Sequence, residues 1–245
     1  MKLIFMSDLH LSPNNIPATK DFIKLLNKFQ LEKIYALYIL GDFFDYWLGD
    51  DDDSEFIRTI KNSLYKLSKY TTIYYIRGNH DFAIGDKFAL ETNIKLLHDC
   101  STINVANNTI LLSHGDIFCT LDTTYQKFKK IIQNKYILYI LKKMPLTWRR
   151  KLKNRLEHSA SSQFNTKDQK IYHVVDTTIL EYTKKYQANI VIHGHTHNPG
   201  VYVLTNTPTI TRIEIPDWDK HPTQSYVLFD THSNTVSIKY GYHQE

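Results

Sequence analysis

The sequence predicts an α/β fold, a four-layer αββα sandwich in which two facing sheets carry helices on their outer sides. Short apolar runs rich in β-branched and aromatic residues alternate with amphipathic stretches in the first third of the chain, and further strand-like runs follow after residue 200. Side chains that bind metals follow five of the apolar runs. Because α/β folds place their chemistry where strands run out into loops, we expect these side chains at one rim of the sandwich.

The individual elements follow from residue spacing. Residues 19–31 and 54–69 have apolar side chains at three- and four-residue spacing and are predicted to be helices that join the first three strands. The acidic run 50–53 is expected to cap the second helix. Asn107-Asn108 is a hairpin turn signal between two strands. The predicted strands cover residues 3–6, 35–40, 72–76, 102–106, 109–112, 190–192, 201–204, 209–215, 225–230 and 235–240.

The chain is expected to form one domain, 1–245, into which residues 120–167 are inserted as a helical cap. A length of 245 residues suits one domain with a sizeable core, and no repeat, linker or low-complexity tract divides it. The segment 126–156 holds eight Lys, three Arg and no acidic residue, so it carries +11, whereas the whole chain carries +5. A mildly acidic body therefore carries one strongly basic segment.

Three helices are predicted in and after the cap. Asp122 is expected to begin a helix that runs until Pro145 breaks it. Thr147 would cap a second helix, and a polar loop over 158–166 would lead to a third that returns to the core. The apolar faces consist of Tyr125, Phe128, Ile132, Tyr136, Tyr139 and Ile140 in the first, Trp148, Leu152 and Leu156 in the second, and Ile171, Val174, Val175, Thr178, Ile179 and Tyr182 in the third.

Three interpretations of the basic cap are open. It can be a solvated charge face, it can bind nucleic-acid phosphates, or it can lie on anionic lipid with its apolar side chains in the acyl boundary. The aliphatic content favours lipid, because proteins that bind single-stranded nucleic acid use spaced aromatic platforms more than Ile and Leu. An anionic membrane surface and an acylated substrate are therefore the expected partners, and nucleic acid is not.

Five short segments carry the metal-binding chemistry. They are Asp8-Leu9-His10, Gly41-Asp42, Gly78-Asn79-His80-Asp81, His114-Gly115-Asp116 and His193-Gly194-His195-Thr196-His197. A lone His is more often a core residue than a ligand, but five such segments at strand ends favour a metal centre. The candidate ligands are two carboxylates, one amide and four imidazoles, namely Asp8, His10, Asp42, Asn79, His114, His195 and His197. This mixture of oxygen and nitrogen suits Mn, Fe, Zn or Mg.

Seven ligands are too many for one tetrahedral ion, so we expect two ions that share Asp42. Paired ions clamp the attacking and leaving oxygens of an in-line displacement at phosphorus. Hydrolysis of a phosphate ester or anhydride is the predicted reaction.

In this order the motifs resemble those of the calcineurin-like metallophosphoesterases. The stretches YILGDFFDYWLGDDD (38–52), HGDIFCTLDTTYQKF (114–128) and HGHTHNP (193–199) more closely resemble the UDP-2,3-diacylglucosamine diphosphatases of lipid A biosynthesis, and the resemblance covers essentially all 245 residues. It implies that a diphosphate bond is hydrolysed to release UMP and 2,3-diacylglucosamine 1-phosphate. It also implies two divalent metal ions as cofactors, with Mn as the expected metal. It also implies a peripheral protein on the cytoplasmic face of the bacterial inner membrane.

The resemblance implies a role for each site residue. The first ion is expected on Asp8, His10 and His197, the second on Asn79, His114 and His195, with Asp42 on both. His80 would stabilise charge on the phosphoryl oxygens or protonate a leaving oxygen, and Asp81 would orient it. The expected substrate contacts are Asn79, His80, Asp122, Tyr125, Phe128, Lys167 and His195.

The sequence departs from the diphosphatases at several positions. They commonly carry Arg where this chain has His80, the residue general to metallophosphoesterases. Ala160 and Phe164 stand where a Ser and an Asn are expected, and Glu157 stands in place of a basic residue, whereas Lys167 matches. Two alternatives stay open: another small-molecule phosphodiesterase or nuclease on the same metals, and a membrane-bound binding protein with a relic metal site. The second is disfavoured because every ligand position holds a competent side chain.

Cysteines and hydropathy agree with a cytoplasmic or peripheral protein. Cys100 and Cys119 make no disulfide framework and are expected to be buried thiols in a reducing compartment. The chain reaches Asp8 too early for a signal peptide, and no apolar run approaches the roughly 20 residues that span a bilayer.

Overall fold

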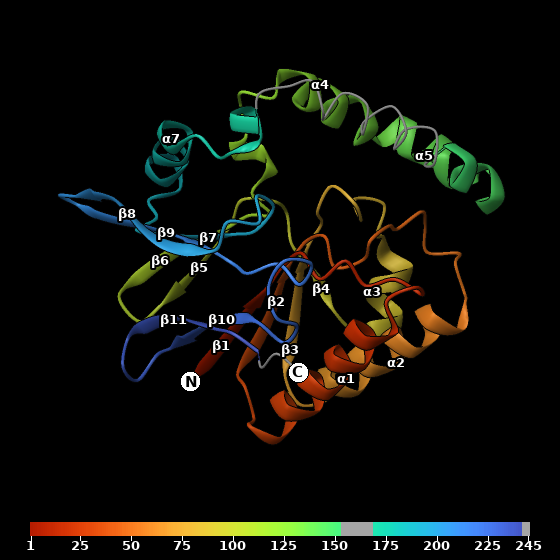
Figure 1. The fold of residues 1–245 in the computed structure, drawn as a ribbon, viewed down its shortest axis with the longest axis horizontal. Coiled ribbons are helices and arrows are strands. Elements are labelled where there is room, and N and C mark those ends of the chain that lie inside the picture. The colour runs from red at the N-terminus through yellow and green to blue at the C-terminus, as the bar shows by residue number, and fades with distance from the viewer. Residues whose placement is uncertain (153–168, 242–245) are drawn as a thin grey trace.

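The computed structural model describes residues 1–152 and 169–241 and confirms the predicted four-layer αββα sandwich. Two sheets face each other in the middle of the molecule, and helices cover their outer sides (Figure 1). The cap helices extend above the sandwich in this view, away from both termini.

The first sheet has the strand order β11-β10-β1-β2-β3-β4. Strands β1 to β4 are parallel, and the helices between them are α1 (Ile16–Leu31), α2 (Glu55–Ser68) and α3 (Asp86–Thr92). Strands β10 and β11 extend the sheet in antiparallel fashion beyond β1. The strands are β1 (Lys2–Met6), β2 (Ala36–Leu40), β3 (Thr72–Ile76), β4 (Lys95–Leu96), β10 (Tyr226–Asp230) and β11 (Thr235–Lys239).

The second sheet has the order β5-β6-β7-β9-β8. Its centre, β6-β7-β9, is parallel, and the hairpin predicted at Asn107-Asn108 joins β5 to β6. Helix α7 (Asp176–Tyr186) leads into β7, and two short 3₁₀ helices, η1 (Asp116–Phe118) and η2 (Gln169–Tyr172), lie before it. The strands are β5 (Ser101–Val105), β6 (Asn108–Leu112), β7 (Ile190–His193), β8 (Gly200–Asn206) and β9 (Thr209–Glu214).

Alternation of side chains along the strands produces the layers. In β1, Ile4 and Met6 pack against the apolar faces of α1 and α2, whereas Leu3 and Phe5 point to the opposite sheet. In the second sheet the same alternation places Leu111 of β6 against Ile179 of α7. Three apolar clusters therefore hold the four layers together.

The ends of the first helices differ from the sequence expectation. Helix α1 begins at Ile16 because the Asn15 side chain accepts a hydrogen bond from Ala18 N–H and a proline lies in the first turn. Ser54 caps α2, so the expectation that the acidic run 50–53 caps it is wrong; Asp51 and Asp52 instead form ion pairs with the cap. The prediction missed α3 and β4, which are too short to show a periodic pattern.

The predicted first cap helix is divided into two, α4 (Thr123–Ile132) and α5 (Lys135–Lys143). Asp122 caps α4 as expected. The helix is then interrupted at Gln133 and Asn134. The Asn134 side chain accepts a hydrogen bond from Tyr136 N–H at 3.0 Å and so caps the start of α5. The competing Asn cap is therefore the reason that one amphipathic pattern forms two helices.

The rest of the cap also differs from the prediction. Thr147 does not cap a helix, because residues 146–152 are already helical and Trp148 N–H bonds to the Pro145 carbonyl. The predicted third helix is shorter than expected and begins at Asp176. The loop 158–166 lies outside the described residues. Within the described part of the chain, every helix is too short or too polar to cross a membrane.

Candidate metal centre

The seven predicted ligands all stand on loops that leave the carboxyl ends of strands. Asp8 and His10 follow β1, Asp42 follows β2, and Asn79 follows β3. The second sheet contributes the remaining ligands, from the loops after β6 and β7, which are also parallel to each other. Two parallel sheet segments therefore direct their carboxyl ends to one rim, where the structure brings the ligands together.

The loops at this rim turn through left-handed backbone conformations. Five of the seven ligands have a positive φ, between 46° and 78°: Asp8, His10, Asp42, His195 and His197. For residues other than Gly, such conformations cost about 1–3 kcal/mol each and persist only where the surroundings impose them. Here the neighbouring loops impose them through backbone bonds, such as Asp8 N–H to the Gly41 carbonyl and His10 N–H to the Asp42 carbonyl, both at 3.1 Å.

Two glycines of the motifs let the carboxylates approach the backbone. A Cβ at Gly78 would lie 2.1 Å from Asp42 Oδ1, and a Cβ at Gly194 would lie 2.1 Å from Asp8 Oδ2. Instead, Asp42 Oδ1 accepts the backbone N–H of His80, and Asp8 Oδ2 accepts that of His195, both at 2.9 Å. Glycine is therefore required before Asn79 and before His195 for steric reasons.

Asp8, His10 and His197 form the first group that could hold a metal ion, with one ligand atom from each within 4.8 Å of the others. Asp8 Oδ1 lies 3.4 Å from His197 Nε2 and 4.0 Å from His10 Nε2. Asp8 Oδ1 and His10 Nε2 are both buried, and neither has a hydrogen-bond partner among the residues that the structure describes. Because buried polar atoms are costly without a partner, these two atoms fit a cation that both would bind.

Asp42, His114 and His195 form the second group. Asn79 joins it, since its Oδ1 lies 2.9 Å from His114 Nε2, and His195 Nδ1 lies 3.2 Å from the same nitrogen. His114 Nδ1 donates a hydrogen bond to the Leu40 carbonyl at 2.9 Å, which leaves Nε2 as the atom that faces the group. Asp42 also belongs to a group with His10 and His80, so it lies between the two sites.

Charges inside the site keep its carboxylates ionised. Burial by itself raises the pKa of Asp8, but the contact with His197 and the charge of His114 outweigh it and lower this pKa to about 2. His114 and His80 likewise hold the pKa of Asp42 well below its usual value, against the effect of burial. Burial, together with the neighbouring His114, lowers the pKa of His195 to about 4. At neutral pH these three side chains are in the deprotonated form that binds cations.

His80 lies beside the Asp42 carboxylate. Its Nε2 is 4.0 Å from Asp42 Oδ2, and its Nδ1 donates a hydrogen bond to the Asp45 carbonyl at 2.7 Å. Burial by itself lowers the pKa of His80, but Asp42 and the Asp45 carbonyl outweigh it, so this pKa is raised. One ring nitrogen is therefore held by a loop, and the other faces the metal groups.

Asp81 does not orient His80, contrary to the expectation from the sequence. Its side chain is fully buried and accepts hydrogen bonds from the N–H groups of Phe43 at 2.8 Å and Gly78 at 2.7 Å, and from the Tyr75 hydroxyl. Asp81 therefore joins the backbones of the loops that carry Asp42 and Asn79.

The first cap helix is attached beside the second metal group. The Tyr125 ring stacks on the His195 ring with 6.2 Å between their centroids, and the Tyr125 hydroxyl donates to the buried Asp116. Lys129 lies one helical turn further along α4 than Tyr125, and its Nζ contacts Asp116 at 2.8 Å. The predicted substrate residues Asn79, His80, Tyr125 and His195 therefore lie around the metal groups.

The other predicted substrate residues are placed differently. Asp122 is buried, and its side chain accepts a hydrogen bond from Tyr125 N–H at 3.1 Å, so it caps α4. Phe128 lies further along α4 and is exposed. Lys167 lies outside the described residues. The same holds for Glu157, Ala160 and Phe164, the positions at which the sequence differs from the diphosphatases.

The sequence reading missed two buried carboxylates at the same rim. Glu214 accepts hydrogen bonds from the Thr196 hydroxyl and from Asn198 N–H, and so holds the loop that carries two histidine ligands. Asp217 Oδ2 contacts His221 Nδ1 at 2.7 Å, and its Oδ1 lies 3.6 Å from His197 Nδ1. Both acids stand at or after the carboxyl end of β9, so the strand-end rule that found the ligands could have found them too.

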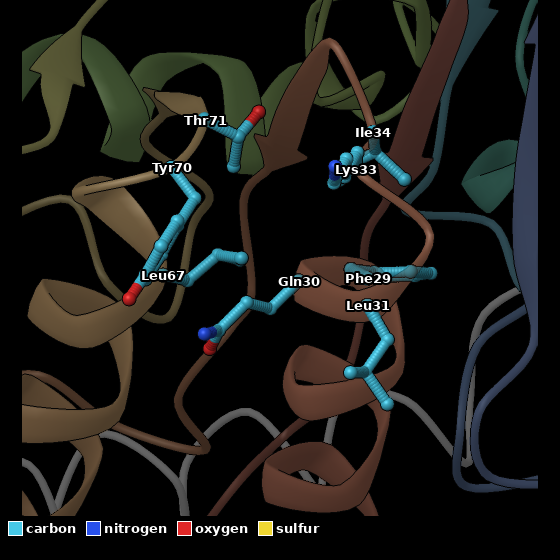
Figure 2. Close-up of a pocket in the computed structure, with 8 residues that line it drawn as sticks. All are labelled: Phe29, Gln30, Leu31, Lys33, Ile34, Leu67, Tyr70 and Thr71. Atoms are coloured by element: carbon cyan, nitrogen blue, oxygen red, sulfur yellow. The ribbon is translucent and has the colours of Figure 1, made fainter.

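A hollow of about 400 Å³ opens elsewhere, beside the C-terminal ends of α1 and α2 (Figure 2). Phe29, Ile34 and Leu67 line it, and its neighbouring backbone leads into β2 and β3 rather than out of them. Its lining has neither a carboxylate nor an imidazole. The metal groups at the opposite strand ends are therefore the candidate active site.

Comparison with known proteins gives a consistent family. The sequence pattern of the calcineurin-like phosphoesterases matches residues 1–199. A protein of Coxiella burnetii (strain RSA 331) named UDP-2,3-diacylglucosamine hydrolase is 38% identical over 216 residues, which cover 88% of each chain. Proteins of the same name from Vibrio atlanticus and Pseudomonas entomophila are 34% and 37% identical, over 89% of this chain and 90% and 91% of theirs.

Solved structures share the fold at lower identity. A dimetal phosphatase from Danio rerio is 11% identical with a TM-score of 0.53, covering 93% of this chain and 91% of its own. An archaeal phosphodiesterase is 14% identical with a TM-score of 0.52, covering 98% and 100%. At these identities the likeness shows the fold alone.

Proposed function

Because the chain belongs to the calcineurin-like phosphoesterase family, we propose that it is a metal-dependent hydrolase that cleaves the diphosphate bond of UDP-2,3-diacylglucosamine. The products are UMP and 2,3-diacylglucosamine 1-phosphate. Relatives at 34% to 38% identity carry the name of this substrate. The observation that carries the proposal is that Asp42 shares one candidate metal group with His10 and another with His114 and His195, and that Tyr125 of the first cap helix stacks on His195.

The rim residues would hold two divalent ions, and we propose that these ions are Mn. The first site consists of Asp8, His10 and His197, the second of Asn79, His114 and His195, and Asp42 serves both. Bound there, the ions supply Lewis-acid charge that activates the attacking water and offsets negative charge on the phosphoryl oxygens. His80 presents Nε2 beside Asp42 and contacts a phosphoryl oxygen of the UMP-side phosphate. Both products leave as phosphomonoesters, so positioning matters more than protonation.

The nucleotide and sugar lie between the rim and α4. Tyr125 is suited to contact them because its ring already faces His195. Phe128 lies one turn further along α4 and contacts the acyl portion. Asp122 supports this surface by capping the helix, and Lys167 remains the predicted phosphate contact of the cap.

The outer face of the cap rests on an anionic membrane surface in this proposal. Its exposed apolar side chains are Ile131, Tyr136, Tyr139, Ile140 and Trp148. Exposed lysines lie among them, at 127, 130 and 143. Basic helices with such side chains lie in the boundary between headgroups and acyl chains. The protein would therefore work at the cytoplasmic face of the bacterial inner membrane, where it meets a UDP-linked diacylated sugar and not nucleic acid.

Release of UMP from UDP-2,3-diacylglucosamine tests the proposal. Chelator-treated protein should be inactive and should regain activity with Mn, and the Asp42→Ala variant should stay inactive. Hydrolysis of an aryl phosphodiester by the same samples reports on the metal centre alone. Aryl phosphodiester turnover without UMP release under any metal would reject the lipid substrate and keep the metal centre.

A second candidate function is that of another phosphodiesterase or a nuclease on the same metals. It is favoured by His80, since the diphosphatases commonly carry Arg there. Preferred hydrolysis of a generic phosphodiester or of single-stranded DNA over the lipid substrate would select it.

A further inference from the structure

Arg149 is buried against the catalytic body, although it belongs to the most basic part of the chain. Its guanidinium forms a two-pronged contact with the Asp51 carboxylate, Nη1 to Oδ1 at 2.8 Å and Nη2 to Oδ2. Nη1 also donates to the Leu48 carbonyl, and Nε donates to the Met144 carbonyl at 2.9 Å. Only 4% of Arg149 is exposed, so its charge is used inside the protein.

The loop that receives Arg149 leaves space for it at Gly49. A Cβ on this glycine would lie 2.2 Å from Arg149 Nη1 and 2.7 Å from Asp51 Oδ1. The φ of Gly49 is +146°, a conformation that side chains disfavour. Any other residue would displace the ion pair, so the loop is shaped around the guanidinium.

The neighbouring Arg150 provides a contrast within the same helix. Its ion pair with the described residues is one contact, from Nη2 to Asp52 Oδ2 at 3.3 Å, and its side chain is 55% exposed. Exposed single ion pairs contribute little. Arg149 is different because its guanidinium is buried, although the Asp51 side chain is 56% exposed, so loss of the Asp51 carboxylate would leave a buried charge without compensation. Arg149 and Arg150 are therefore a matched pair that differs in burial and geometry.

The loop that holds Arg149 also holds His80. The Asp45 carbonyl accepts the His80 ring Nδ1–H at 2.7 Å, and Trp47 N–H donates to the His80 carbonyl at 3.0 Å. Trp47 Nε1 donates to Asp50, which also accepts two N–H groups around the start of α3. The loop is thus fixed to the catalytic body on one side and to the cap on the other.

We propose that Arg149 is a positioning residue that fastens the far end of the described cap to the loop of Asp51, and so determines the preference for substrates that touch the cap and the metal groups together. Tyr125 and Lys129 fasten the near end through Asp116. With both ends attached, the cap keeps one position relative to the rim. A small phosphodiester needs only the rim and does not depend on Arg149. The substrate preference rests on the proposed function, whereas the attachment does not.

The test compares Arg149→Gln and Asp51→Asn with the control Arg150→Gln. Hydrogen exchange should become faster in residues 135–152 of the first two variants and stay unchanged in the control. The KM for UDP-2,3-diacylglucosamine should rise about tenfold in Arg149→Gln, while aryl phosphodiester turnover stays within about twofold in all three. Arg149→Lys keeps the charge without the fork, so it should give an intermediate KM.

Three results would decide against the inference or separate its parts. Exchange in residues 135–152 that is the same in Arg149→Gln, Arg150→Gln and the parent protein would overturn the attachment. An equal loss of turnover on both substrates, with faster exchange throughout the strands, would reduce Arg149 to a general stabilising residue and reject the positioning role. If the parent protein does not hydrolyse the lipid substrate, the proposed function fails, and exchange in this segment still decides the attachment.

Discussion

The metal rim and the cap both gather charged side chains, but they do so in opposite ways. At the rim, Asp8, Asp42 and His114 are buried on loops, and some ligand atoms have no partner within the described protein. In the cap, most of the described lysines are exposed, and the cations that turn inward, Lys129 and Arg149, each meet a carboxylate of the catalytic body. The rim therefore presents buried ligand atoms that a cation from outside the protein can bind. In the cap, the buried cations are already paired with carboxylates of the catalytic body.

The rim and the cap also differ in how far apart in the sequence their interacting residues lie. Each candidate rim ligand lies within a short motif at a strand end, and Gly78 and Gly194 stand directly before Asn79 and His195. The Arg149–Asp51 pair joins residues 98 positions apart, and the Lys129–Asp116 pair joins a helix to the loop after His114.

Loss of the shared carboxylate should have the largest effect. Asp42→Ala is expected to lose both ions and to lower turnover by about a thousandfold or more, since a bound metal contributes several kcal/mol to transition-state stabilisation. Asn79→Ala removes a ligand of one site only and should keep about one ion. Metal content by mass spectrometry decides between them, with Asp51→Ala as a control that should keep both ions. Equal metal loss in the Asp42 and Asn79 variants would contradict a shared carboxylate.

Outward charge on the cap should have the next largest effect, on membrane binding alone. Each lysine near an anionic bilayer contributes about 1 kcal/mol, so removing four should weaken binding to anionic vesicles by on the order of a hundredfold or more. Arg149 and Arg150 are not part of this set, because they pair with the catalytic body. The variant changes Lys127, Lys130, Lys143 and Lys151 to Ser, and its charge-matched control changes Lys20, Lys24, Lys66 and Lys69.

Vesicle sedimentation at two salt concentrations checks this expectation. High salt should release the parent protein as the four changes do, because the attraction decays within about 8 Å at physiological ionic strength. Hydrolysis of an aryl phosphodiester should not change. Equal vesicle binding by the variant and its control would mean that the cap lysines form only a solvated face.

The sequence predicted the sandwich and the grouping of the candidate ligands at one rim because both follow from local rules. Alternating apolar runs mark strands, and a chelating side chain after a strand marks the rim, as for Asp42 after β2. The division of the cap at Asn134 was missed because the apolar spacing continues across the break. The partners of Arg149 could not be predicted, since a basic run shows charge but not which of its members will be buried. Asp81 shows the same limit, because its partners come from three different loops or strands.

Glu214 extends the comparison to a buried rim residue that is no ligand. Burial raises its pKa from 4.5 to about 7, even though Thr196 and Asn198 donate hydrogen bonds to it. Because this pKa is raised in the folded state, the protonated Glu214 carboxyl contributes to the free energy of unfolding below pH 4.5. This contribution, about 3 kcal/mol, is lost as pH rises through 7. Glu214→Gln keeps the acceptor oxygen and cannot ionise, so its free energy of unfolding should not show this loss.

Urea unfolding of chelator-treated protein between pH 4.5 and pH 8 measures the effect of Glu214→Gln. The exposed Glu181 on α7 provides a control, Glu181→Gln, whose pH profile should follow that of the parent protein. If all three profiles coincide, the Glu214 carboxyl is not held in its protonated form by burial.

Replacement of His80 by Arg should have the smallest effect on turnover of the diphosphate substrate, within about tenfold, if His80 stabilises the phosphoryl group. The geometry supports this expectation, because His80 is held by the Asp45 carbonyl and points Nε2 toward Asp42, and a guanidinium can donate to the carbonyl and to phosphoryl oxygens at once. His80→Ala removes every donor and should lose about a hundredfold. If instead His80 must give up a proton, Arg cannot replace it at neutral pH. A folded, metal-loaded Arg variant that is as inactive as the Ala variant would therefore show that this edge of the rim supplies a proton rather than a fixed charge.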